Sequence, residues 1–239
     1  MFNPNDKFIE LKKNVRELGF DGVLYSFFPR AMYLNSKTQP LIHYCNTFEP
    51  FVRHYFENNY GNNDFVIRLI SERGIEPIDW WQEITNGNVT REERKVTLDA
   101  KNNFNIENGL TVPVLSGSFA MSAISVISRN GDSDYFQEIK NSHIEELQEL
   151  AIDYHFYILS SCERVRFFVE PLFVNLNQTK KNVIRHLIGG KPMKTITNKY
   201  NISQRYAEKT LINIRNEFGN ISTNEFIYSL GVCNIDRYL

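Results

Sequence analysis

Polar side chains near the end of the chain have the types and spacing that binding to nucleic acid requires. Lysine and arginine bind phosphate oxygens, and arginine, glutamine and asparagine also hydrogen-bond base edges in a major groove. The chain places several of these residues on the exposed side of two predicted helices. The candidates for contacting DNA are Lys194, Gln204, Arg205, Lys209 and Asn213.

The net charge is close to zero, but it is distributed unevenly. The 239 residues include 27 Lys and Arg against 28 Asp and Glu. Residues 172–239 hold ten basic and four acidic residues (+6), which leaves 17 basic and 24 acidic residues (−7) in residues 1–171. A basic tail on an acidic body is typical of a polyanion-binding module attached to another domain. The alternative is a chance imbalance on solvated helix faces.

Three predicted helices must position the basic side chains. An apolar stripe marks a helix over 180–188, and a short second helix covers 193–200. Ser203 is a good N-cap for a third helix, whose apolar residues recur at helical spacing. They are Ala207, Leu211, Ile214 and Phe218. This order of helices is the helix-turn-helix arrangement. A three-helix bundle that serves only for packing is the alternative.

The body of the chain alternates predicted helices and strands. Helices before, between and after neighbouring strands indicate a sheet with helices on both faces, so the fold class is α+β. We expect helices at 6–17, 49–56, 65–71, 91–101 and 133–168. We expect strands at 22–28, 110–115 and 120–128, and a short strand or core edge at 78–81.

Residues with possible catalytic or metal-binding chemistry do not form a recognisable site. His43, Cys45 and His54 have no fourth ligand at a metal spacing. Asp153 and His155 are two apart in a helix, so their side chains face different directions. The sequence has no Gly-rich phosphate loop and no metalloprotease or hydrolase motif. We therefore expect no catalytic residues, no metal and no cofactor, and we do not expect an enzyme.

The cysteines and the lengths of the apolar runs indicate where the protein is located in the cell. The three cysteines are widely separated, which is typical of reduced thiols in the cytoplasm. No apolar run approaches the roughly 18 residues of a membrane helix. We expect a cytoplasmic protein without a membrane contact.

The order and spacing of several motifs resemble the LuxR-type quorum-sensing transcriptional regulators. In the body, the matching residues are Phe51, Tyr55, Asp64, Trp80, the pattern Gly109-Leu-Thr111-Val-Pro113, and Ser125. In the tail, they are Leu176, Gly190-Lys191, Ile196, Ser203, Leu211 and Phe218. The resemblance covers nearly the whole chain.

The resemblance implies two domains: an autoinducer-binding domain over 1–170 and an all-α helix-turn-helix domain over 176–239. The first would be an α/β/α sandwich around an antiparallel sheet, with a buried pocket for a small acylated signal such as an acyl-homoserine lactone. In that pocket Tyr55 would donate to the acyl carbonyl, and Asp64 would accept from the amide N–H. Ser125 would add a hydrogen bond, and Trp80 would pack against the head group.

The same residues have ordinary alternatives, and one of them departs from the family. Phe51 and Trp80 could be core aromatics, Asp64 a helix cap and Ser125 a plain strand residue. The family usually has tryptophan at Phe51, and its indole N–H donates to the lactone carbonyl. Losing such a buried hydrogen bond costs about 1–3 kcal/mol. Phe51 is therefore a ligand-binding candidate that lacks a donor, as expected of a divergent or solo member.

The sequence as a whole predicts a dimeric transcription factor that senses a small molecule and binds DNA. A homodimer is expected because such proteins read two half-sites, and the predicted helix 133–168 is its expected interface. Two alternatives remain open. One is a ligand-independent regulator. The other is a partner protein that does not bind DNA and instead forms heterodimers with another regulator.

Overall fold

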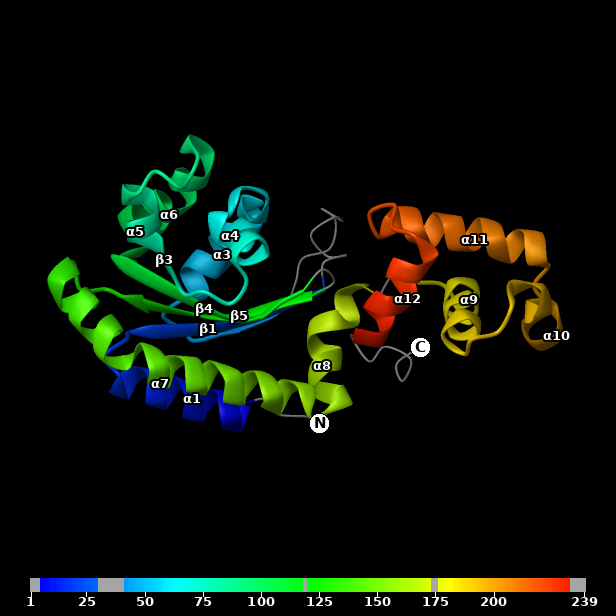
Figure 1. The fold of residues 1–239 in the computed structure, drawn as a ribbon, viewed down its shortest axis with the longest axis horizontal. Helices are drawn as coiled ribbons and strands as arrows, with labels where there is room; N and C mark the ends of the chain where they lie inside the picture. The colour runs from blue at the N-terminus through cyan, green and yellow to red at the C-terminus, as the bar shows by residue number, and fades with distance from the viewer. Residues whose placement is uncertain (1–4, 30–40, 118–119, 173–175, 233–239) are drawn as a thin grey trace. The chain divides into compact units, whose positions relative to one another are not determined.

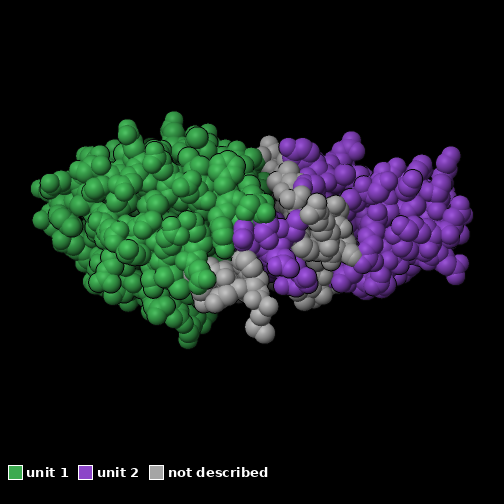
Figure 2. Space-filling view, turned by 90° about the horizontal axis from the view of Figure 1, so that it is seen from below, with its two compact units in different colours: residues 1–27, 42–160 green, residues 28–41, 161–239 purple. Residues whose placement is uncertain are grey.

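The protein is described by a computed structural model over residues 5–29, 41–117, 120–172 and 176–232. Its residues divide into two compact units, shown in different colours in Figure 2. The main division along the chain falls between Ser160 and Ser161. The domain boundary expected over 170–176 falls later, and residues 173–175 lie outside the described part. That boundary stays a prediction.

The first unit is built on a sheet of five strands in the order β2-β1-β5-β4-β3. The pairs β1–β2, β3–β4 and β4–β5 are antiparallel. The strands are β1 (Gly22–Pro29), β2 (Ile42–Tyr44), β3 (Ile78–Asp79), β4 (Asn108–Ser116) and β5 (Ala120–Ser128). The predicted strands at 22–28, 110–115 and 120–128 are confirmed, whereas the three-residue β2 was not predicted.

Helices cover both faces of this sheet, as the alternation of predicted elements indicated. Figure 1 shows α1 and α7 on one face and α3, α4, α5 and α6 on the other. The first pair spans Asn5–Glu17 and Ser133–Leu159. The other helices are α3 (Glu49–Glu57), α4 (Phe65–Arg73), α5 (Trp80–Thr85) and α6 (Arg91–Phe104), with a short 3₁₀ helix η1 at Tyr60–Asn63.

Side-chain caps fix where several of these helices begin. Asp64 accepts the backbone N–H of Val66 at 2.9 Å and so caps α4. At the start of α6, Thr90 and Glu93 form a complete capping box, as their spacing predicts. Because caps satisfy the free N–H groups of a first turn, these local signals set the helix starts correctly.

Two predicted elements were wrong in part. The helix expected over 133–168 is interrupted: α7 ends at Leu159, Ser161 is extended, and α8 begins at Cys162 and ends at Val169. The stretch 78–81 is a strand for only two residues. Asp79 accepts the backbone N–H groups of Trp81 and Gln82, so α5 begins at Trp80. At the second place the Asp79 side chain decides the local structure through these caps, whereas the Ser161 side chain makes no capping hydrogen bond to α8.

The side of the sheet that faces α7 carries a buried aromatic core with polar pairs in it. Tyr25 and Tyr154 are among the largest fully buried side chains. The Tyr154 hydroxyl lies 2.7 Å from Nδ1 of His43. The Tyr25 hydroxyl lies 2.9 Å from Nδ1 of His155. These two pairs link β1, β2 and α7 across the layers.

The second unit comprises residues 28–41 and 161–239, and its described helices all lie in the later segment. It contains α8, a 3₁₀ turn η2 at Glu170–Leu172, α9 (Gln178–Ile188), a 3₁₀ turn η3 at Met193–Thr195, α10 (Ile196–Tyr200), α11 (Gln204–Glu217) and α12 (Thr223–Val232). The predicted helices over 180–188, 193–200 and from Ser203 onward are confirmed. The helix α12 was not predicted, although Phe226 and Leu230 are buried one turn apart.

Candidate functional site

Tyr55 and Asp64, which the sequence placed separately against a ligand, hydrogen-bond to each other. The Tyr55 hydroxyl on α3 donates to Oδ2 of Asp64 at 2.7 Å. The other carboxylate oxygen of Asp64 accepts from Val66 as the α4 cap. Asp64 is therefore both a helix cap and the acceptor of a cross-helix bond. Its carboxylate oxygens have further lone pairs that could accept from a ligand N–H or O–H.

The electrostatic environment of Asp64 disfavours its charged form. Burial raises the pKa of the Asp64 carboxyl, and the negative charge of Glu93 acts in the same direction. The hydrogen bonds from Tyr55 and the backbone of Val66 oppose that rise in pKa. A ligand donor would add one more bond to the carboxylate and favour its ionised form.

Trp80 at the start of α5 and Ser125 on β5 belong to a second hydrogen-bonded group, which Thr111 on β4 joins. The Trp80 indole N–H donates to Oγ1 of Thr111 at 3.0 Å. Thr111 Oγ1 lies 2.9 Å from Oγ of Ser125, opposite it on the neighbouring strand. In the sequence Thr111 was recognised only as part of the Gly-x-Thr-x-Pro motif. Its role in joining Trp80 to Ser125 was not predicted.

Gly109 explains how Trp80 can lie flat on the sheet. A Cβ atom at this position would be 2.2 Å from the Trp80 ring. Any side chain here would displace the indole, so glycine is required by close approach and not by its dihedral angles. The Gly-x-Thr pattern thus provides a space for Trp80 and, two residues on, the acceptor for its N–H.

Phe51 lies in an aromatic cluster and is 7 % exposed. Its ring centroid is 5.9 Å from Tyr55 and 5.5 Å from Phe104. The ring thus fills the space beside the Tyr55–Asp64 pair with carbon alone. This geometry agrees with a core aromatic and equally with an apolar wall of a ligand site.

Ion pairs fix the helices that carry these groups. Arg68 on α4 bonds Glu93 on α6 at 2.8 Å, and its guanidinium holds the Glu93 pKa below the usual value. Arg73 on α4 bonds Glu83 on α5 at 2.6 Å and lowers that pKa too. Both carboxylates are largely buried. These pairs lock α4, α5 and α6 into one layer.

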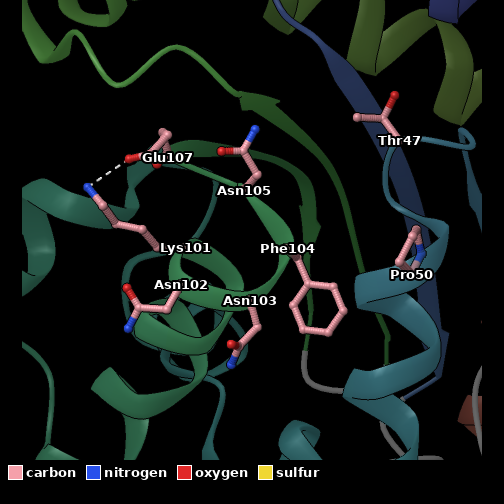
Figure 3. Close-up of a pocket in the computed structure, with 8 residues that line it drawn as sticks. All are labelled: Thr47, Pro50, Lys101, Asn102, Asn103, Phe104, Asn105 and Glu107. Carbon is pink, nitrogen blue, oxygen red and sulfur yellow. Dashed lines mark ion pairs between the residues drawn. The ribbon is translucent and has the colours of Figure 1, made fainter.

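Beside Phe104 the structure has a hollow of about 560 Å³ at the end of α6 (Figure 3). Lys101 and Glu107, joined at 2.9 Å, form one side, and Thr47 and Pro50 the other. The described residues lining it do not include the five expected ligand residues. Its amide and charged groups can hydrogen-bond a polar molecule, and it adjoins Phe51 through the Phe104 ring and through the neighbouring residue Pro50.

Comparison with known proteins decides the family. The sequence model of the autoinducer-binding domain matches residues 4–157. The chain belongs to this family. No curated protein matches the chain at a significant level.

Solved structures share the fold of this autoinducer-binding protein. The crystal structure of Escherichia coli SdiA matches with a TM-score of 0.55 at 14 % identity, over 99 % of this chain and 93 % of that one. A structure of SdiA in complex with octanoyl-rac-glycerol matches with a TM-score of 0.52 at 15 % identity, over 98 % and 89 %. These likenesses show the mixed helical and antiparallel fold. Most of the matched residues 4–157 lie in the first unit, which is the autoinducer-binding domain of the chain.

In the second unit all five candidates for contacting DNA are exposed. They are Lys194, Gln204, Arg205, Lys209 and Asn213. The opposite side of α11 is buried at Ala207, Leu211 and Ile214 and contacts α9 and η3. Gln204 is not independent of its neighbours, because its amide donates to the Glu208 carboxylate at 2.7 Å.

The described residues add two further observations. Within them, no three His, Cys, Asp or Glu side chains gather where they could hold a metal ion. No helix in the described part of the chain is both long and apolar enough to span a membrane.

Proposed function

We propose that this protein is a cytoplasmic, non-enzymatic transcriptional regulator of the LuxR type. Its autoinducer-binding domain would bind a small acylated signal, and its helical unit would bind DNA as a helix-turn-helix. The observation that carries the proposal is the exposed basic face of α11 in a chain that begins with an autoinducer-binding domain. The family supports the signal, and the charge and geometry of the second unit support DNA.

The way in which α10 is followed by α11 supports a helix-turn-helix in the second unit. The short helix α10 ends at Tyr200, and its C-cap residue Asn201 has a left-handed φ of 53°. Ser203 caps α11 by accepting the N–H of Tyr206. The two helices are thus joined by a three-residue turn, residues 201–203, as in known helix-turn-helix motifs. The longer helix then presents Arg205 and Lys209 to solvent.

A homodimer would let two such units read two half-sites. The helix α7 supports this because two large apolar residues one turn apart are exposed on it. Ile152 is 44 % exposed and Phe156 is 64 % exposed. Covering them with a second copy would remove apolar surface from water.

The signal would be an acyl-homoserine lactone or a related acylated molecule. The SdiA complex holds an acylated glycerol, which has an acyl carbonyl but no lactone. In this chain Phe51 offers no hydrogen bond to a lactone carbonyl, while Asp64 and Ser125 can hydrogen-bond a ligand. A ligand without a second carbonyl fits these side chains as well as a lactone does.

Ligand binding is tested by calorimetry with an acyl-homoserine lactone. We expect Phe51→Trp to raise the lactone affinity by up to about tenfold, because the indole restores a donor worth roughly 1.4 kcal/mol. Asp64→Asn should weaken binding more than Phe51→Ala does, because a carboxylate forms a charge-assisted bond with the ligand N–H. Absence of lactone and acylglycerol binding by every variant would favour a ligand-independent regulator, whose Tyr55 and Trp80 donors are satisfied internally.

DNA binding is tested by its salt dependence. The logarithm of affinity should fall with the logarithm of salt concentration, with a slope of about −0.9 for each phosphate neutralised. Arg205→Ala and Lys209→Ala should weaken binding, and each lost phosphate contact should reduce the slope by about 1. Lys12→Ala, an exposed lysine on α1, is the control. A wild-type protein with no affinity for genomic fragments would favour the heterodimerising partner instead.

A further inference from the structure

A large aromatic side chain is exposed in the first turn of α11. Tyr206 is 55 % exposed, although it lies next to Ala207, which is fully buried. Its backbone N–H is held by the Ser203 cap at 3.3 Å, so the start of the side chain is fixed by the helix. An aromatic ring in water forgoes the stabilisation that burial of its apolar surface would give. A ring exposed on the helix proposed to bind DNA is therefore available for an apolar contact with DNA.

The residues around Tyr206 are suited to different kinds of contact with DNA. Arg205 and Lys209 are exposed cations that suit phosphates or guanine. Gln204 and Glu208 hydrogen-bond each other at 2.7 Å, which restrains both side chains. Within this turn, Tyr206 is the exposed side chain with a large apolar surface. Its hydroxyl can donate to a phosphate oxygen, but its ring carries no charge and can make only apolar contacts with DNA.

The first turn of a recognition helix is the part that reaches base edges in the major groove. The apolar group that bases present there is the C5 methyl of thymine. We propose that Tyr206 contacts a thymine methyl and thereby sets part of the sequence preference of this protein. This inference rests on the proposed function, because it requires that α11 enters the major groove.

The test compares thymine with uracil, which lacks only that methyl group. The full chain first selects its preferred duplexes from a random pool, and each thymine in the selected site is then replaced by uracil in turn. For the wild type, one replacement should weaken binding by about fourfold, the effect of burying one methyl group. Tyr206→Ala should bind the thymine and uracil duplexes equally, whereas Tyr206→Phe should keep the difference.

Tyr228→Ala is the matched control, because Tyr228 is an aromatic residue of similar exposure (59 %) on α12. It should keep the uracil penalty. The inference is overturned if Tyr206→Ala retains the full penalty or if the selected site contains no thymine that matters. If the wild type binds no DNA at any salt concentration, the proposed function fails, and the inference with it. Salt-dependent binding by Tyr206→Ala with unchanged sequence preference would overturn the inference alone.

Discussion

Replacing Lys140 with methionine is expected to lower the free energy of unfolding of the autoinducer-binding domain by about 3–5 kcal/mol, the usual cost of leaving a buried partner charge unpaired. The Lys140 ammonium lies 2.8 Å from Oδ2 of Asp79. The two side chains are only 13 % and 6 % exposed. The substitution keeps the apolar stem and removes the charge, so the largely buried Asp79 carboxylate would lose its cationic partner.

Asp79 contacts two helices, so loss of its Lys140 partner should weaken the packing of both. The same carboxylate accepts from Gln137 at 2.8 Å and caps α5 through Trp81 and Gln82. Asp79 therefore joins the helix that carries Trp80 to α7 on the other face of the sheet. Without the Lys140 ion pair, the contacts of Asp79 with α5 and α7 should both become less stable.

Unfolding in urea followed by tryptophan fluorescence measures this effect on the right unit. The chain has two tryptophans, Trp80 and Trp81, and both lie in the autoinducer-binding domain. Lys12→Met on the exposed side of α1 is the control and should change stability by less than about 0.5 kcal/mol. In the double variant with Asp79→Asn, the loss should be less than additive, because the two side chains interact. Additive losses, or a Lys140→Met variant as stable as the control, would contradict the role of this pair.

Local signals in the sequence predicted much of the fold, because they act within a few residues. The capping box at Thr90 and Glu93 and the cap at Asp64 each set a helix start correctly. The break at residues 160–161 was missed because the apolar residues of α7 and α8 continue at helical spacing across it. The pair of Asp79 and Lys140 was also missed, because its partners are 61 residues apart and only the tertiary fold brings them together.

The candidate site shows the same limit. The sequence predicted that Tyr55 and Asp64 would each hydrogen-bond a ligand. It could not show that the tyrosine hydroxyl is directed at the carboxylate, because that depends on how α3 packs beside α4. Thr111 was similarly seen as part of a motif, while its bonds to Trp80 and Ser125 depend on strand register.

A second large effect on stability is expected at acidic pH. Below neutral pH the autoinducer-binding domain should lose stability through two buried histidines. Burial lowers the pKa of His43 to about 4 and that of His155 to about 4, whereas an unfolded histidine has a pKa of about 6.5. Between these pH values the unfolded chain binds more protons than the folded one, so stability falls as pH falls. Each histidine should cost about 2 kcal/mol between pH 7 and pH 5.

Other groups affect a different range or act in the opposite direction. The pKa values of Glu83, Glu93 and Asp99 are lowered, so their losses come only at lower pH, where carboxylates protonate. The raised pKa of Asp64 has the opposite sign and favours the folded state as its carboxyl protonates. Between pH 7 and pH 5 the loss of stability should therefore come from the two histidines, and protonation of Asp64 would act against it.

Variants separate the two histidines from the rest of the chain. His43→Gln and His155→Gln should each remove about half of the loss measured by urea unfolding between pH 7 and pH 5, because glutamine does not take up a proton. His143→Gln, on the same helix as His155 but 37 % exposed in its side chain, should leave the loss unchanged. Both buried rings contact a tyrosine hydroxyl in the layer between the sheet and α7, so the protonation of either one should separate these layers. A wild-type stability that stays constant down to pH 5 would show that both rings can take up a proton in place.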